Sequence, residues 1–202
     1  MGGSEVGAGF LFDEERHRYT VAGMAVPGIT QILKLTGFVE ASWFTRESRE
    51  RGTAVHRACW YMSEKALDWQ SVDPTILPRV EQFADFLEEY KPALVAAPEQ
   101  PLYSFSHGFA GTPDFIFTVM GHPSIIEVKT GRAGLAAKLQ TAAQKILIEE
   151  NLGIKDIRRF AFELSGEGRY KFVPHTDHGD KVMFLNAVSM VRRRINEGEL
   201  KL

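Results

Sequence analysis

Hydrophobic and polar positions alternate along this chain in blocks that predict both strands and helices. Residues 115–119 and 124–128 are β-branched and aromatic runs separated by Met120-Gly121-His122-Pro123, which predicts a β-hairpin. Similar runs predict a hairpin over 10–26 and strands over 157–164 and 170–175. Apolar residues at helical spacing predict a short helix ending at Leu35 and longer helices over 43–66, 79–90, 135–151 and 180–197. The pattern therefore predicts an α/β fold with a mixed central sheet flanked by helices.

Two of the predicted helices carry polar residues beside their apolar stripes. In the helix over 43–66, Val55, Cys59 and Met62 form the apolar stripe, and His56 shares another face with Gly52. In the helix over 135–151, Gln140 and Gln144 are four residues apart and share one face, and the predicted core stripe consists of Leu135, Leu139, Ile146 and Leu147. Gly153 fits the C-terminal end of that helix. A proline-containing connector spans residues 68–78.

Composition restricts the class of protein. With 202 residues and 44% hydrophobic content, we expect a flexible, glycine-rich N terminus over 1–9 and one domain over 10–202. The single cysteine, Cys59, excludes an internal disulfide framework and predicts a buried thiol in a reducing compartment. No apolar run approaches eighteen residues and no hydrophobic signal region is present, which predicts a cytoplasmic protein without a membrane partner. The net charge of −2 gives no global nucleic-acid signal, although a cleft can still be locally positive.

The hairpin over 115–128 places three charged residues together. Asp114 lies opposite Glu127 if the turn is tight, or opposite Lys129 if it is two residues wider. Because side chains alternate between faces, either register leaves all three residues on one face. Three charged groups on one face of a sheet are costly to remove from water. A divalent cation offsets this cost, and carboxylate oxygens suit Mg²⁺ or Mn²⁺. The alternative is an exposed ion pair between Glu127 and Lys129, with Asp114 as a turn residue.

Several segments together resemble one nuclease superfamily. Gly111-Thr112-Pro113-Asp114 followed by Glu127-Val128-Lys129-Thr130-Gly131 resembles the signature of the PD-(D/E)XK nucleases, in particular their RecB-type and lambda-exonuclease-type branch. Arg51-Gly52-Thr53-Ala54-Val55-His56 is similar to the G-x-x-x-H element of that branch, and Leu139-Gln140 to its Q-x-x-x-Y element. Residues 10–33 resemble the entry of phage-type members, so the resemblance covers about residues 10–195. Position 144 departs from the pattern, because it is Gln where the family often has Tyr.

The resemblance implies a restriction-endonuclease-like fold and a metal site. Asp114 and Glu127 are expected to hold Mg²⁺ or Mn²⁺, with the Val128 carbonyl as an extra ligand. Lys129 would assist the attacking water or stabilise the transition state. His56 would contact a second ion, although without the resemblance it would be interpreted as a packed or surface histidine. Gln140 would orient Lys129 or the scissile phosphate.

Other residues have weaker expected roles. Glu99 is a candidate for supporting the metal ligands, because 99–104 resembles a strand entry of the same branch, and Glu81 competes for that role. Gln144 is interpreted as a solvated helix position. Arg46, Arg49 and Arg57, on the helix that carries His56, are predicted to contact DNA phosphates. Arg51 also flanks His56 on this helix.

The resulting functional prediction is a Mg²⁺- or Mn²⁺-dependent DNA exonuclease in recombination or repair. The alternatives are a structure- or sequence-specific endonuclease on the same fold and an inactive nucleic-acid-binding subunit. DNA is the predicted partner, and a single-strand annealing or recombination protein is a further candidate. Because Cys59 is the only cysteine, the four-cysteine iron–sulfur cluster of some relatives is excluded. Cleavage polarity, strand preference, processivity and oligomeric state stay open.

Overall fold

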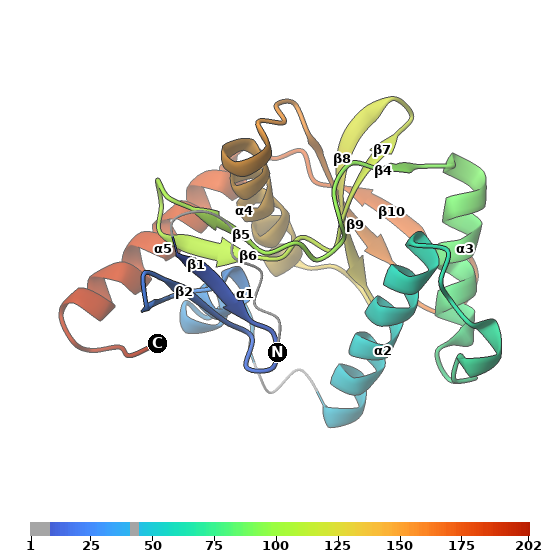
Figure 1. The fold of residues 1–202 in the computed structure, drawn as a ribbon, viewed down its shortest axis with the longest axis horizontal. Helices are drawn as coiled ribbons and strands as arrows, with labels where there is room; N and C mark the ends of the chain where they lie inside the picture. Colours follow the sequence, from blue (N-terminus) through green and yellow to red (C-terminus); the bar gives the residue numbers. More distant parts are fainter. Residues whose placement is uncertain (1–8, 41–44) are drawn as a thin grey trace.

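A five-stranded mixed sheet forms the centre of the molecule (Figure 1). The computed structural model describes residues 9–40 and 45–202, so most of the predicted flexible segment over 1–9 lies outside the described residues. Within the sheet, β8 and β9 are parallel and the other neighbours are antiparallel. The strand order is β10 (Lys171–Pro174), β9 (Arg158–Glu163), β8 (His122–Lys129), β7 (Phe115–Val119) and β4 (Ala93–Leu94).

Helices cover both faces of this sheet, which confirms the predicted α/β class and agrees with the restriction-endonuclease-like fold. Helices α2 (Arg46–Ser63) and α3 (Leu77–Tyr90) pack on the face that carries Phe115, Ile126 and Val128. The other face, with Ile116 and Ile125, packs against α1 (Ile29–Leu35), α4 (Leu135–Leu152) and α5 (Gly179–Asn196). Strand β8 carries apolar residues on both faces, Ile125 on one and Ile126 and Val128 on the other, because helices cover both.

The β7–β8 hairpin has a tighter turn than the four residues suggested by the sequence. Val119 pairs with His122, which leaves only Met120 and Gly121 in the turn. Their φ angles of 50° and 78° match a two-residue turn with two left-handed positions, the type that suits the twist of a hairpin. The register then continues from Phe115–Ile126 to Asp114 beside Glu127. Of the two predicted registers, the tight one is therefore present.

The predicted helices are present with small shifts at their ends. Gly153 has a φ of 66° directly after α4 and ends it as expected. The predicted start of the second helix at Trp43 lies outside the described residues, and α2 begins at Arg46 after the Thr45 cap. Leu135 is wrongly placed in the core stripe, since it is 47% exposed at the first turn of α4. The proline-containing connector includes a short 3₁₀ turn, η2 (Trp69–Ser71). No described helix is long and apolar enough to cross a bilayer.

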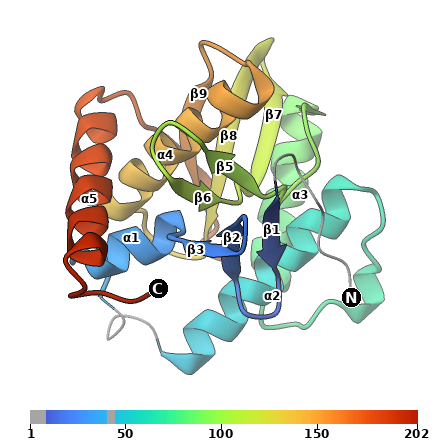
Figure 2. The ribbon, with the colours of Figure 1, turned by 60° about the vertical axis from the view of Figure 1, so that its left-hand side comes forward.

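The N-terminal region differs from the predicted hairpin. It is a three-stranded meander of β1 (Phe10–Asp13), β2 (Arg18–Val21) and β3 (Met24–Val26), because the Ala22-Gly23 turn adds a third strand. The meander lies beside the small sheet of β5 (Leu102–Ser104) and β6 (Phe109–Gly111) (Figure 2), and a bridge from Gly28 to Ala110 joins the two. The sequence pattern does not predict β4 or β6, since strands of two or three residues carry too little periodicity.

Gly111 makes a close approach that tests the packing of β6. A Cβ at Gly111 would lie 2.5 Å from Cδ1 of the buried Ile29 and 3.2 Å from Cδ1 of Leu147. We expect Gly111→Ala to lower the free energy of unfolding by about 1–3 kcal/mol, the usual cost of overpacking. Gly131→Ala is the control, because a Cβ there meets no atom within 4 Å. Denaturant unfolding measures both, and equal stabilities would contradict the packing argument.

Candidate active site

Asp114 and Glu127 form a pair of carboxylates at one end of the central sheet. Asp114 precedes β7, where the ladder has not yet begun, and Glu127 lies in β8. Asp114 is 9% exposed and Glu127 is 1% exposed. Two buried carboxylates require compensating charge or hydrogen bonds. The ion pair between Glu127 and Lys129 is thus not the exposed surface pair of the alternative interpretation.

Both oxygens of Asp114 have partners. Oδ2 accepts a hydrogen bond of 2.8 Å from the Val128 amide, and Oδ1 lies 3.4 Å from Nδ1 of His56 on α2. Burial opposes the charge on each side chain, but their mutual attraction prevails. As a result, the pKa of Asp114 is lowered and the pKa of His56 is raised to about 9. The pair is therefore ionic near neutral pH.

Glu127 is held by Lys129 and by the helix that follows it. Nζ of Lys129 donates to Oε1 of Glu127 at 2.8 Å and to Oε1 of Gln140 at 3.0 Å. Burial and the Asp114 charge raise the pKa of Glu127. Burial acts against the charge on Lys129, yet the carboxylates of Glu127 and Asp114 raise its pKa, so Lys129 stays cationic. The two carboxyls thus differ in acidity, with Asp114 ionising first.

The structure assigns Gln144 a contact that the sequence interpretation missed. Gln144 is 1% exposed, and its Nε2 donates to Oε2 of Glu127 at 2.6 Å. The prediction of a solvated position is wrong, because this face of α4 lies on the charged face of β8. The shared face of Gln140 and Gln144, four residues apart, was the available signal. Oε1 of Gln144 is buried with no hydrogen-bond partner among the described residues, so it can accept from a water or ligand in the site.

Glu99 joins Asp114 and His56 in a group that suits a cation. One ligand atom from each of the three lies within 4.8 Å of the other two. Glu99 has a left-handed φ of 54°, a conformation that is costly for a residue other than glycine, and its amide donates to the Pro113 carbonyl at 3.1 Å. Burial and the Asp114 charge raise the pKa of Glu99. Glu81 is exposed on α3 and is not part of this group.

The donor set fits a divalent cation. Glu99, Asp114 and Glu127 bring three carboxyl groups close enough that the charge of Asp114 raises the pKa values of the other two. A dication relieves such repulsion, and carboxylate oxygens are ligands that Mg²⁺ and Mn²⁺ prefer. The Val128 amide points to Asp114, and in an extended strand the carbonyl of the same residue points to the same side. The orphaned Oε1 of Gln144 gives a further acceptor beside the cluster.

The remaining candidates lie around this cluster on α2. A Cβ at Gly52 would lie 3.8 Å from Oγ1 of Thr130, so α2 passes close to the segment after Lys129. The charge of the exposed Arg57 reaches Glu99 and lowers its pKa against the dominant effect of burial. Arg46 is highly exposed and pairs with Glu50 at 2.7 Å, and Arg49 is exposed. Phosphate contacts from these arginines stay a prediction.

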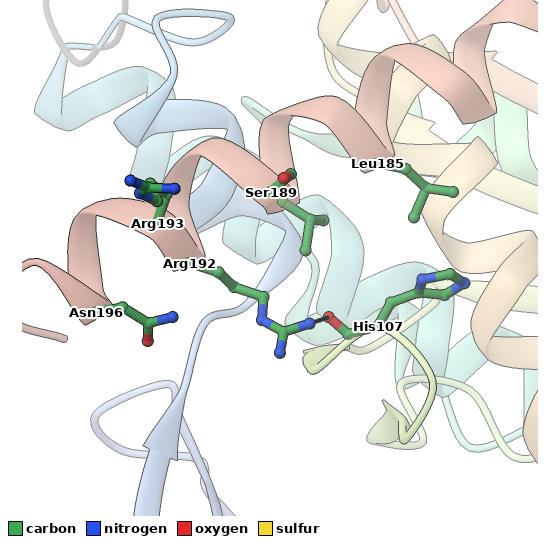
Figure 3. Close-up of a pocket in the computed structure, with 7 residues that line it drawn as sticks. His107, Leu185, Ser189, Arg192, Arg193 and Asn196 are labelled. Atoms are coloured by element: carbon green, nitrogen blue, oxygen red, sulfur yellow. Dashed lines mark hydrogen bonds between the residues drawn. The ribbon is translucent and has the colours of Figure 1, made fainter.

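A separate pocket lies between α5 and the β5–β6 turn (Figure 3). Arg192, Asn196 and His107 line it, and Nη1 of Arg192 donates to the His107 carbonyl at 3.3 Å. None of the carboxylates described above lines this pocket. The candidate active site is therefore defined by its side-chain cluster.

Comparison with solved structures finds a weak likeness to this chain. Neither a family model nor a curated protein matches this chain. The protein in a crystal structure from Eubacterium rectale, named "Putative exonuclease", has 14% sequence identity to this chain. The superposition covers 89% of this chain and 79% of that protein's chain, with a TM-score of 0.48. A likeness at this level carries no argument about activity, so the proposals below rest on the geometry of the side chains and on the motif resemblance.

The two glutamines of α4 allow a matched test of the Glu127 environment. Gln144→Leu removes a hydrogen bond to the ionised carboxylate, so we expect the pKa of Glu127 to rise further. Gln140→Leu removes a contact to Lys129 instead and is the control. Carboxyl ¹³C NMR titration of the metal-free protein measures the pKa. An unchanged Glu127 pKa in Gln144→Leu would show that this hydrogen bond does not tune the site.

Proposed function

We propose that this protein is a metal-dependent deoxyribonuclease of the PD-(D/E)XK type. The observation that carries the proposal is the buried carboxylate pair of Asp114 and Glu127 with the Lys129 ammonium 2.8 Å from Glu127. Hydrolysis of a phosphodiester needs a cation to bind phosphate oxygen and a positive group where charge develops. The motif resemblance supplies the substrate class, and the cluster supplies the groups.

In this proposal, the metal ligands would be Asp114, Glu127, Glu99 and His56, with the Val128 carbonyl in support. His56 would bind as neutral imidazole, releasing to solvent the proton that it carries beside Asp114 in the metal-free protein. A bound Mg²⁺ or Mn²⁺ supplies Lewis acidity and lowers the pKa of a coordinated water. We assign Glu99 as a metal ligand and not only as a supporting acid. One of its carboxylate oxygens lies within 4.8 Å of a ligand atom of Asp114 and of one of His56. Gln144 positions Glu127 through its 2.6 Å hydrogen bond.

Lys129 acts on the phosphate side. Its hydrogen bonds to Glu127 and Gln140 fix the direction of the ammonium, and its side chain is 30% exposed, so it can reach a substrate. The raised pKa keeps it cationic at neutral pH, which suits charge stabilisation better than general-base catalysis. Gln140 is a positioning residue for Lys129.

We favour an exonuclease of recombination or repair in the cytoplasm, acting on DNA and supported by an annealing or recombination partner. The motif resemblance to the RecB-type and lambda-exonuclease-type branch is the support for this choice. A structure- or sequence-specific endonuclease is the second candidate. An inactive binding subunit is less consistent with the site, because Asp114, Glu127 and Lys129 are all present. Asp114 accepts from the Val128 amide, and Lys129 donates to Glu127 and Gln140.

Substitutions in the cluster should abolish cleavage while the protein stays folded. We expect Asp114→Asn and Glu127→Gln to lose cleavage, and Lys129→Met to slow it by about 10²-fold or more, the scale of one transition-state contact. Glu81→Gln is the control, because that acid is exposed on α3. Rates are measured with Mg²⁺, Mn²⁺ or EDTA on end-labelled linear, single-stranded and closed circular DNA.

The same assay separates the candidate functions. Release of mononucleotides from linear DNA alone supports the exonuclease, and nicking of closed circles supports the endonuclease. Retention of DNA without cleavage supports the binding subunit. Near wild-type cleavage by folded Asp114→Asn would contradict the assignment of the site.

Metal binding gives a second, independent prediction. We expect Glu99→Gln and His56→Gln each to weaken Mn²⁺ binding by about tenfold or more, because each removes one ligand from a set of few. Isothermal titration calorimetry without DNA measures the dissociation constant, and Glu81→Gln again is the control. Wild-type affinity in both variants would remove Glu99 and His56 from the metal site.

A further inference from the structure

The interface between α2 and α3 ends in two arginines. Val55 and Cys59 on α2 belong to the same buried cluster as Val80 and Phe83 on α3. Arg51 lies one helical turn before Val55, and Arg79 directly precedes Val80. The two helices lie side by side against the sheet (Figure 1). At their N-terminal ends, the apolar interface therefore gives way to two cationic side chains.

These two guanidinium groups have few partners. Val55 and Val80, which lie near the two arginines in the chain, belong to one buried cluster, so α2 and α3 bring Arg51 and Arg79 to the same region. Burial and the positive charge of Arg51 lower the pKa of Arg79, and the charge of Glu167 acts in the opposite direction. Nη1 of Arg51 lies 3.8 Å from a carboxylate oxygen of Glu47, whose side chain is 89% exposed, and Nη1 of Arg79 donates to the Thr75 carbonyl at 3.5 Å. The Nε of each arginine is buried and has no hydrogen-bond partner among the described residues. Two like charges with unpaired donors are costly, and Glu47 and Glu167 offset only part of that cost, so a bound anion would stabilise the pair.

The surrounding backbone keeps space beside Arg79. A Cβ at Gly166 would lie 2.9 Å from Nη1 of Arg79, and the φ of Gly166 is 79°, which favours glycine on both counts. Gln82 holds this turn in place, since its Oε1 accepts from the Gly166 amide at 3.2 Å and its Nε2 donates to the Gly168 carbonyl at 2.9 Å. The turn over 165–168 is thus fixed against the arginine.

The arginine pair lies near the catalytic end of the sheet. The turn over 165–168 follows β9, and the segment over 130–134 follows β8, so both leave the carboxyl ends of the two parallel strands. Gly52, the neighbour of Arg51, packs beside Thr130, the residue after Lys129. Ligands in α/β sheets bind outside the carboxyl ends of strands. The pair is separate from the carboxylates that would hold the metal.

From this geometry we propose that Arg51 and Arg79 form a binding site for a non-scissile phosphate group of the nucleic-acid substrate. Guanidinium forks match phosphate oxygens in geometry as well as charge. The chain has a net charge of −2, so attraction for a polyanion must come from local positive groups such as this one. This inference rests on the proposed nuclease function, which supplies the polyanion.

The test measures binding without cleavage. The double variant Arg51→Gln/Arg79→Gln is compared with Arg193→Gln/Arg194→Gln, which removes two exposed arginines of α5 that pair with Glu197 and Glu199. Fluorescence anisotropy with a labelled single-stranded oligonucleotide in EDTA gives the dissociation constant across a salt series. We expect the first double variant to bind about tenfold more weakly and its salt slope to fall by about 0.7 for each lost phosphate contact. The control should match wild type.

Two further comparisons identify the role of the pair. Arg51→Lys/Arg79→Lys keeps the charge and loses the fork, so we expect it to bind more weakly than wild type and more tightly than the glutamine variant. Circular dichroism and thermal unfolding check the folding of each protein. If the glutamine variant does not fold, wild-type affinity and salt slope in the lysine variant overturn the site.

Modified oligonucleotides distinguish the source of the phosphate. A neutral methylphosphonate at the contacted internal position, or removal of the 5′-phosphate, should weaken wild type and leave the glutamine variant unchanged. Either pattern supports the site and says whether the phosphate is internal or terminal. No binding by wild type, or the same affinity and salt slope in both glutamine variants, overturns it. Arginine-dependent binding without cleavage by wild type would keep this site and reject the nuclease function.

Discussion

The arrangement of this protein depends on two carboxylates that are removed from water at the end of the β7–β8 hairpin. Asp114 and Glu127 repel each other there, and burial adds to the cost of their charge. Each neighbouring element contributes a group that lowers this cost: α2 supplies His56, β8 supplies Lys129, and α4 supplies Gln144. Without a cation these contacts hold the cluster together, and with one they would surround it. The same groups therefore serve both the stability of the apoprotein and the proposed chemistry.

The fold brings these groups together because Asp114 lies just outside the sheet. Within the sheet, α2 and α4 lie on opposite faces and cannot reach the same side chain. Before β7 begins, no strand separates the two layers, so His56 from one face and the Gln140 and Gln144 face of α4 from the other approach the same pair of carboxylates. The left-handed backbone at Glu99 adds a third carboxylate from the preceding loop. Local backbone strain of this kind is commonly kept where function requires it.

Positive charge is distributed to match this negative centre. Lys129 compensates Glu127 directly, whereas Arg51 and Arg79 lie beside the segments that leave β8 and β9, and the Nε of each has no hydrogen-bond partner among the described residues. A substrate phosphate bound by the two arginines would be held near the metal ligands without competing for them. In the proposed function, this separation of binding from chemistry would let a chain with a net charge of −2 bind a polyanion.

The sequence by itself determined the features that depend on local periodicity. The alternation of β7 and β8 placed Asp114, Glu127 and Lys129 on one face whichever register was present, and helical spacing placed Gln140 and Gln144 together. Only the tertiary structure decided that Gln144 is buried against Glu127, that Glu99 reaches Asp114 and that the charge of Arg51 acts on Arg79. These interactions join residues 15 to 28 positions apart through packing and through a left-handed backbone at Glu99. Periodicity states which face of an element a residue occupies, but the partner of that face is set by how the layers pack.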